Sequence, residues 1–313
     1  MKIWIVSILP ICDRFSSWFN KEFLKAGDQL GVDIEVLGLN TPCVKTLTNY
    51  FTNEYEAVEH EISIIKVLNT EVLKGDKVLW LDLDYPGFAV SMAFLLKLRG
   101  VKSYGILHGA YFNEGDVWAS TPERRWFMKA GVEVCEKVFV GSEYFKSEIV
   151  RNLDVDPSKI VATGLPFDPS RYRFDPNVKK DIVVVVEERK VNIPNYIVVE
   201  GRNLNYEYFK KLLEVAKYMI VFKKAETFGY AVLEALASGV IVLTPKKFSY
   251  PEFKSDKDDL LVFVEAFDDA IKFVSTHKWD VKDVTNRYFN TYKVIERYRD
   301  SAVRILEEVA KDG

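Results

Sequence analysis

The sequence predicts an α/β protein built from two parallel sheets, each with helices on both faces. Three observations support this fold class. Short apolar runs rich in β-branched residues alternate with segments of helical periodicity along the chain. The second half opens with DIVVVVEE (181–188), a continuous run typical of a strand buried on both faces. Between the halves, residues 166–180 contain three prolines and show no periodicity, as a linker would.

The first half alternates strands and helices in a regular order. Apolar residues Trp18, Phe19 and Phe23 lie on one face of the first helical segment, and Gly31 ends it. Apolar runs predict strands at 2–9, 32–39, 77–85, 102–109, 137–142 and 159–166. Helical spacing predicts helices at 16–30, 54–73, 88–100, 124–136 and 143–152.

The second half repeats this alternation and closes with helices. Strands are expected at 181–188, 196–201, 218–222, 240–245 and 259–265, and helices at 206–217 and 229–238. The longest helix is expected at about 291–311.

These patterns predict two Rossmann-like domains. We expect an N-terminal domain at 1–165, a linker at 166–180 and a C-terminal domain at 181–290. The final helix at 291–313 either covers the second sheet or crosses back to the N-terminal domain. Ligands of such sheets bind at the carboxyl ends of the strands, so a cleft between the domains is the expected binding place.

Composition excludes several classes of function. Lys and Arg total 43 against 46 acids, so there is no basic excess for nucleic acid. The cysteines Cys12, Cys43 and Cys135 are scattered, which argues against a disulfide framework and a zinc ribbon. No apolar run reaches the ~18 residues that a transmembrane helix needs. We therefore expect a soluble cytoplasmic protein, with peripheral contact to a membrane surface left open.

The stretch ETFGYAVLE carries the most chemical information. It places Glu226 in a loop after a strand and Glu234 eight residues later, inside the next helix. The backbone N–H groups of Thr227, Phe228 and Gly229 are then free donors at a helix N-terminus, which favours an anion. A diphosphate there, with two carboxylates for hydroxyl groups, would suit a nucleotide-sugar. Alternatively, Glu226 is a first-turn acid favoured by the helix dipole and Glu234 a surface acid.

This stretch resembles a known family. ETFGYAVLEALASG (226–239) is similar to the E-x7-E segment of GT-B glycosyltransferases, closest to the retaining, family-4-like group that includes glycogen and sucrose-phosphate synthases. TGLPFDPSRY (163–172) resembles the exit from the N-terminal domain of that family, and GSEYFKSEIV (141–150) resembles the helix before it.

The resemblance implies a fold and an activity. Two domains face each other across a cleft, and a sugar moves from a UDP-, GDP- or ADP-linked donor to an acceptor hydroxyl with retention. The hexosyltransferase type is implied, and neither a metal nor another cofactor is needed. The acceptor is left open among glycans, lipids and proteins.

The resemblance also implies roles for individual residues. Glu226 and His108 would be catalytic residues that contact the donor sugar, and Glu234 would accept hydrogen bonds from the ribose. Thr227, Phe228 and Gly229 would line the donor through their backbone. The family's phosphate-binding Arg and Lys are not clearly present here. Arg189 and Lys190, which follow a strand, are the best candidates for the diphosphate and Arg202 is the second choice, with Lys223 or Lys224 as substitutes. His108 has the alternative of an ordinary loop residue, and His60 and His277 fit surface helix positions.

Departures from the family pattern keep other functions open. Residues 9–18 have no glycine where the family has a Gly-rich loop, so Asp13, Arg14 or Ser16 would make the contacts there. A degenerate GT-B protein that binds a sugar without turnover is therefore one alternative. Asp82 and Asp84 form a D-x-D at a strand end, which would suit a one-domain, metal-dependent GT-A transferase or a haloacid dehalogenase-like phosphatase.

Overall fold

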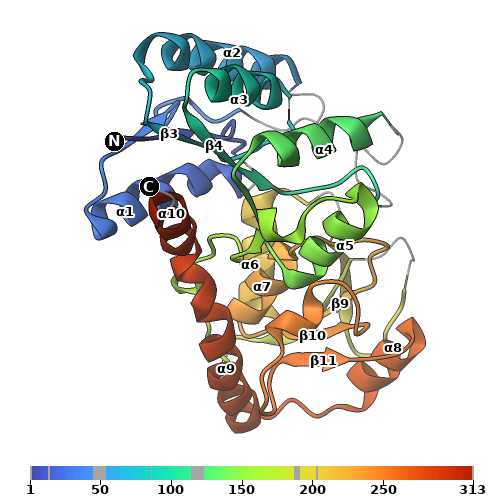
Figure 1. The fold of residues 1–313 in the computed structure, drawn as a ribbon. Coiled ribbons are helices and arrows are strands. Elements are labelled where there is room, and N and C mark those ends of the chain that lie inside the picture. The colour runs from blue at the N-terminus through green and yellow to red at the C-terminus, as the bar shows by residue number, and fades with distance from the viewer. Residues whose placement is uncertain are drawn as a thin grey trace. The chain divides into compact units, whose positions relative to one another are not determined.

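The computed structural model divides into two compact units, shown in Figure 1. The first unit comprises Met1–Pro166 and Asp300–Gly313, and the second comprises Phe167–Arg299. Each unit holds one parallel sheet with its own helices, which confirms the predicted fold class. The structure describes residues 2–12, 15–44, 54–85, 87–113, 123–186, 191–201 and 204–311.

The described residues of the first unit form a six-stranded sheet in the order β2-β1-β3-β4-β5-β6. Successive connections run to one side of β1 and then to the other, so the order of strands along the sheet reverses between β1 and β3 while all strands remain parallel. This reversal opens a crevice at the carboxyl ends of β1 and β3. The strands are β1 (Ile3–Val6), β2 (Ile34–Leu37), β3 (Lys77–Trp80), β4 (Lys102–Leu107), β5 (Lys137–Val140) and β6 (Ile160–Ala162).

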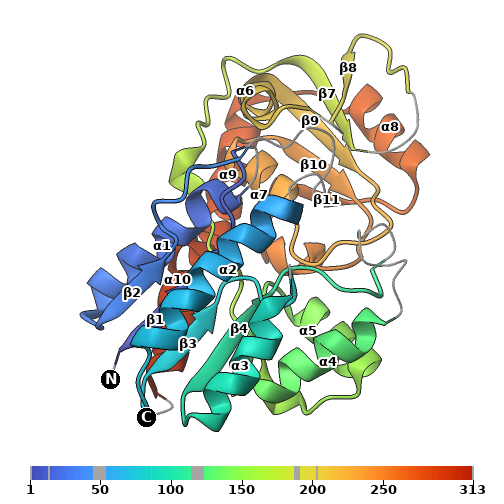
Figure 2. The same cartoon turned by 90° about the horizontal axis from the view of Figure 1, so that it is seen from above.

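Two groups of helices cover the two faces of this sheet. Helices α2 to α5 share one apolar core with the strands, in which Ile64, Ala93, Met128 and Phe145 are buried. Helices α1 and α10 lie side by side (Figure 2). The helices are α1 (Ser16–Leu30), α2 (Glu54–Glu71), α3 (Phe88–Leu98), α4 (Arg124–Val134), α5 (Glu143–Leu153) and α10 (Ser301–Lys311).

The end of the chain differs from the single helix expected at 291–311. Helix α9 (Val281–Ile295) stops, a 3-10 turn follows at Glu296–Asp300, and α10 begins at Ser301. Within this turn, Tyr298 packs its ring on Phe228 and Phe253 of the second unit. Apolar periodicity alone does not reveal that interruption.

Helix α10 is built into the first unit. Its Leu306 and Val309 side chains are fully buried. The buried Lys77 Nζ donates hydrogen bonds to the carbonyl oxygens of Val309 (2.7 Å) and Ala310 (3.0 Å). A cation at the last carbonyl groups satisfies the free acceptors of a helix C-terminus.

The second unit contains a five-stranded parallel sheet, in the order β11-β10-β9-β7-β8, among its described residues. Val183 and Val184 in β7 are fully buried, as the unbroken apolar run predicted. Its strands are β7 (Lys180–Val186), β8 (Ile197–Glu200), β9 (Ala216–Val221), β10 (Ile241–Thr244) and β11 (Leu261–Phe263). Besides α9, its helices are α6 (Tyr206–Val215), α7 (Tyr230–Ala237) and α8 (Phe267–Thr276).

The segment expected as a linker, 166–180, belongs to the second unit from Phe167 onward. Its Phe174 ring stacks on Tyr288 with the ring centroids 3.9 Å apart. The buried Lys179 Nζ donates to the carbonyl oxygens of Leu213 (2.8 Å) and Ser238 (2.6 Å), at the ends of α6 and α7. The segment therefore helps to fix the two helices around the candidate site.

The expectation that the scattered cysteines form no disulfide is wrong for one pair. Cys12 and Cys43 are disulfide-bonded, with their Cα atoms 5.1 Å apart, whereas Cys135 is free and buried. The two loops meet because they follow adjacent parallel strands, and Ile11 pairs with Val44 in an isolated bridge. Spacing along the chain carries no sign of this contact.

Candidate functional site

The loop between β9 and α7 presents free backbone donors. Gly229 caps α7 with φ of 98°, in the left-handed region that favours glycine. A Cβ atom there would lie 3.1 Å from Phe253 Cε2 and 3.3 Å from Tyr250 Cε1. The N–H groups of Phe228 and Gly229 donate no hydrogen bond to any residue that the structure describes. Two donors thus remain at the positive end of the helix.

Glu226 lies in the same loop and is held by its neighbours. Its Oε2 atom forms an ion pair with Lys223 Nζ at 2.7 Å, and its Oε1 accepts the N–H of Thr227 at 3.1 Å. The carboxylate side chain is 14% exposed. Glu226 is therefore a fixed, charge-balanced acceptor next to the free N–H groups.

Glu234 is buried on α7 and accepts hydrogen bonds from two tyrosines. The hydroxyl groups of Tyr172 and Tyr206 both donate to Oε1, each at 2.8 Å, and their oxygens are 3.1 Å apart. Burial raises the pKa of Glu234 to about 7, although the two hydroxyl groups act to lower it. No hydrogen bond reaches Oε2 from the described residues. The alternative of a surface acid is wrong for this residue, which is 4% exposed.

The tyrosine pair was not predicted from the sequence. Tyr172 ends the short 3-10 turn at Pro169–Arg171, and Tyr206 begins α6. The Lys210 ammonium lies 5.5 Å from the Tyr172 ring centroid and 5.9 Å from that of Tyr206. Tyr172 falls inside the stretch resembling the exit from the N-terminal domain, but nothing in the sequence joins it to Glu234.

His108 follows β4 in the first unit and is held as a neutral ring. Its Nε2 donates to the carbonyl oxygen of Leu81 at 2.7 Å. The ring packs on Phe15 and Phe19 of the α1 region, with centroids 5.2 and 5.3 Å away. Burial lowers the pKa of His108 to about 4. At neutral pH the ring is uncharged and has a fixed orientation.

Several predicted residues lie outside the described part of the chain. These are the diphosphate candidates Arg189, Lys190 and Arg202, together with Asp13 and Arg14. Ser16 is described, and its buried hydroxyl accepts the N–H of Ile11 at 3.0 Å. Glu226, Thr227, Phe228, Gly229 and Glu234 all lie in the second unit, around the start of α7.

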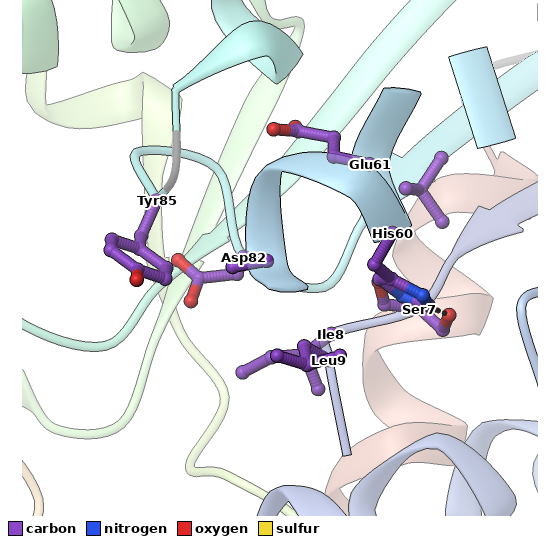
Figure 3. A pocket seen from close by; sticks show the side chains of 9 residues that line it. Ser7, Ile8, Leu9, His60, Glu61, Asp82 and Tyr85 are labelled. Atoms are coloured by element: carbon purple, nitrogen blue, oxygen red, sulfur yellow. Dashed lines mark hydrogen bonds between the residues drawn. The ribbon is translucent and has the colours of Figure 1, made fainter. Parts of the chain in front are cut away.

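A small cavity opens in the crevice of the first unit, where β1 and β3 end. It measures about 20 Å³, roughly the space of one water molecule. Figure 3 shows the carboxyl group of Asp82 on the Tyr85 side of the cavity and the His60 ring beside Ser7. Burial, then Asp84 and Glu61, raise the pKa of Asp82 well above its ordinary value. This cavity cannot contain a sugar.

The D-x-D acids have structural partners. Asp84 forms an ion pair with Arg124 at 3.6 Å, and the Arg124 guanidinium also donates to the Asp84 carbonyl at 2.9 Å. Glu61 accepts the N–H of Phe88 at 3.2 Å, at the start of α3. Among the described residues, no group of three or more His, Cys, Asp or Glu side chains is arranged to bind a metal ion.

The two remaining histidines differ from the expected surface positions. His60 is buried: its Nε2 donates to the Ser7 carbonyl at 3.1 Å, and its Nδ1 lies 3.2 Å from Thr41 Oγ1. Gly38 leaves space for the His60 ring, because a Cβ there would lie 2.6 Å from its Cε1. His277 is half-buried and its Nδ1 lies 2.8 Å from the Tyr218 hydroxyl.

Comparisons by sequence alone find no relatives. No protein-family model matches the chain. No curated protein matches it either.

Solved structures, in contrast, match the chain over its whole length. Sucrose-phosphate synthase from Thermosynechococcus elongatus aligns with a TM-score of 0.71 at 12% identity, covering 99% of this chain and 98% of that one. Anabaena HepE with UDP and glucose aligns at 0.62 and 10%, covering 100% of both chains. The N-terminal domain of Candida albicans trehalose-6-phosphate phosphatase aligns at 0.63 and 10%, covering 99% and 96%.

These likenesses show that the chain has the GT-B fold. They agree with the fold that the E-x7-E resemblance implied. Identities of 10% to 13% establish the fold alone, and one fold hosts several activities. Function must therefore be argued from the residues around α7 and His108.

Proposed function

We propose that the protein is a glycosyltransferase that moves a sugar from a nucleotide-sugar donor to an acceptor hydroxyl. The observation that carries this proposal is the environment of α7. Two free N–H groups, the carboxylate of Glu226 and the carboxylate of Glu234 are all positioned by this one helix and the loop before it. HepE is described with UDP and with UDP-glucose, which supports a UDP-linked hexose as the donor.

Each group near α7 meets one part of such a donor. The N–H groups of Phe228 and Gly229 suit the diphosphate, because both its charge and its oxygens match a helix N-terminus. Glu226 suits the sugar hydroxyls. The unpartnered Oε2 of Glu234 suits one ribose hydroxyl, since the tyrosines already occupy Oε1.

Tyr250 is proposed as a further contact to the nucleotide-sugar donor, one that was not predicted from the sequence. Its hydroxyl is buried and has no hydrogen-bond partner within the described ranges. The ring edge lies against Gly229, and burial, followed by the charge of Glu226, raises the pKa of Tyr250 well above its ordinary value. A buried hydroxyl without a partner costs free energy. A donor bound beside Gly229 would satisfy it.

Catalysis would then depend on position and charge stabilisation. Negative charge grows on the departing diphosphate, and preorganised N–H dipoles and nearby cations stabilise it. Lys223 is one such cation, and Arg189, Lys190 and Arg202 remain the other candidates. His108 is proposed to orient the donor sugar as a neutral group, because its pKa of about 4 means that it is not an imidazolium at neutral pH and cannot serve as a general acid.

We further propose that transfer proceeds with retention and without a metal ion. A metal ion is not required because backbone dipoles and Lys223 would neutralise the charge of the diphosphate. The competing GT-A reading expects one domain, whereas this chain has two units with separate sheets. The degenerate alternative, sugar binding without turnover, is opposed by the presence of both Glu226 and Glu234.

A donor panel tests the proposal. The protein is incubated with UDP-, GDP- and ADP-glucose and with their galactose and mannose counterparts, with and without EDTA. We expect one donor to raise the melting temperature. With water in place of the acceptor hydroxyl, that donor is expected to be hydrolysed slowly to the free sugar and its nucleoside diphosphate, unaffected by EDTA. The anomer of the newly released sugar, read by NMR before it equilibrates, reports retention. Binding without release supports the degenerate alternative, and neither binding nor release contradicts the proposal.

A further inference from the structure

Helix α3 of the first unit turns an apolar face to solvent. The exposed positions of this helix, which the structure describes completely, include four apolar residues and two polar ones, namely Phe88, Ser91, Phe94, Leu95, Lys97 and Leu98. Phe94, Leu95 and Leu98 are 56%, 53% and 71% exposed. An outer helix of an α/β unit ordinarily carries polar residues there. A contiguous exposed apolar surface usually marks an interaction site.

The exposed surface extends over the helices on either side of α3. In the part of the chain described, α3 contacts both α2 and α4, as Figures 1 and 2 show. Leu73, just after α2, and Trp126, on α4, are each 68% exposed. We call this surface the α3 face and define it as Leu73, Phe88, Phe94, Leu95, Leu98 and Trp126.

Backbone and side-chain contacts fix the geometry at one end of the α3 face. The Gly75 N–H donates to the Gly100 carbonyl at 3.4 Å. The Lys74 side chain packs beside Gly100: a Cβ atom added to Gly100 would lie 3.3 Å from Lys74 Cγ. The loop after α2 therefore lies against the loop after α3, and Leu73 joins the end of the helix at which Leu98 is exposed.

Basic side chains surround this same end. Lys74, Lys97, Arg99 and Lys102 are all exposed there, against two exposed acids, Glu71 and Glu136, and the half-buried Asp76. The Arg99 guanidinium donates to the Val72 carbonyl at 2.9 Å, so its position is fixed. At the other end, Arg125 stacks on the Trp126 ring, 5.6 Å from its centroid. The α3 face thus combines apolar and aromatic side chains with a cationic rim.

We propose that the α3 face docks on an anionic lipid surface. Leucine and aromatic side chains enter the boundary between headgroups and acyl chains, while long basic side chains reach anionic headgroups. The protein would lie on the bilayer: no helix within the described residues is long and apolar enough to cross one.

Vesicle co-sedimentation of the full chain tests this docking. Vesicles of phosphatidylcholine alone are compared with equimolar phosphatidylcholine and phosphatidylglycerol. One variant carries Leu95→Ser and Leu98→Ser, and another carries Lys97→Gln and Lys102→Gln. The matched control is Phe289→Ser, which removes a 59% exposed apolar side chain from α9 of the second unit. All four side chains changed on the α3 face are exposed, so equal melting temperatures are expected and are checked.

We expect the wild type and Phe289→Ser to pellet with the anionic vesicles and to be released by high salt. The double serine variant loses at least about tenfold in partitioning, because two leucines no longer leave water. The double glutamine variant loses severalfold. No pelleting of the wild type, or equal pelleting of the serine variant, overturns the proposal. The proposal is also overturned if sedimentation equilibrium shows that the wild type is a dimer, that the double serine variant is a monomer, and that the wild type does not bind vesicles.

Discussion

Glu234 shows how neighbouring side chains control a carboxylate in this protein. Burial raises its pKa from an ordinary 4.5 to about 7, and the Tyr206 and Tyr172 hydroxyls oppose that rise. The folded state therefore keeps a proton that the unfolded chain loses above about pH 4.5. The contribution of Glu234 to the free energy of unfolding therefore falls as the pH rises from about 4.5 to about 7. The ionised form accepts a ribose hydroxyl more strongly than the protonated acid does, so donor binding is expected to strengthen over the upper part of the same range.

Tyr206→Phe should shift that pH dependence upward. The change removes the larger of the two hydrogen bonds that lower the Glu234 pKa. Nucleotide affinity is measured by calorimetry from pH 6 to pH 9, and its midpoint should move to higher pH than in wild type. Tyr208→Phe is the matched control, because Tyr208 lies on the same helix but is 54% exposed. An unchanged midpoint in Tyr206→Phe would show that the tyrosine does not control Glu234.

Tyr250→Phe separates a ligand contact from a structural one. The hydroxyl has no partner among the described residues, so its removal should leave the melting temperature unchanged or slightly raised. Donor affinity should fall by ~0.5–1.5 kcal/mol, about twofold to tenfold. Thermal melts and titrations with the best donor measure both quantities. Lower stability with unchanged affinity would assign the hydroxyl to the fold instead.

At the scale of elements, Gly229 fixes how the donor loop enters α7. Gly229→Ala forces a side chain into a left-handed backbone and against Phe253 and Tyr250. We expect a loss of roughly 1–3 kcal/mol in unfolding free energy and a clear loss of donor affinity. Gly75→Ala is the control, since Gly75 has φ of 93° and no neighbour within 4 Å of a Cβ. Equal losses of unfolding free energy at both sites, measured by urea unfolding, would show that the contacts of Gly229 with Phe253 and Tyr250 do not matter for stability.

Elements were predictable where local patterns decide them. Helix α1 occupies Ser16–Leu30 as predicted, because its apolar face and Gly31 are both local signals. Strand β3 ends at Trp80 although the apolar run continues to Tyr85. Leu81 and Leu83 are fully buried but leave the sheet at the crevice, and burial does not distinguish a strand from a buried loop. The break between α9 and α10 was missed because helical periodicity continues across it, whereas the packing of Tyr298 on Phe228 within the turn is a tertiary contact.

At the scale of the whole molecule, the two-sheet architecture followed from alternation and from the proline-rich boundary. Contacts between distant segments could not be predicted from these patterns. The Cys12–Cys43 bond, the burial of His60 and the tyrosines on Glu234 each join residues from separate elements. No local pattern specifies such pairs. The E-x7-E stretch was visible because its two acids and its glycine lie on one short run of chain.

The return of α10 to the first unit has a measurable consequence. Leu306→Ala should destabilise this unit by ~2–5 kcal/mol, because the side chain is fully buried. Hydrogen exchange should speed up in β1 and β3 and stay unchanged in β7 and β9. Leu233→Ala, at a fully buried position of α7 in the second unit, is expected to show the reverse pattern. Equal acceleration in both units would contradict the assignment of α10 to the first.

The most direct test of the glycosyltransferase assignment is calorimetric titration of UDP, GDP and ADP into the wild type and Glu234→Gln. One nucleotide is expected to bind the wild type with a single site per chain. The variant should fold normally and bind that nucleotide ~1.5–3 kcal/mol more weakly, because a charged hydrogen bond to the ribose is lost. Equal affinity of the two proteins for that nucleotide, or no binding of any nucleotide to the wild type, would contradict the account.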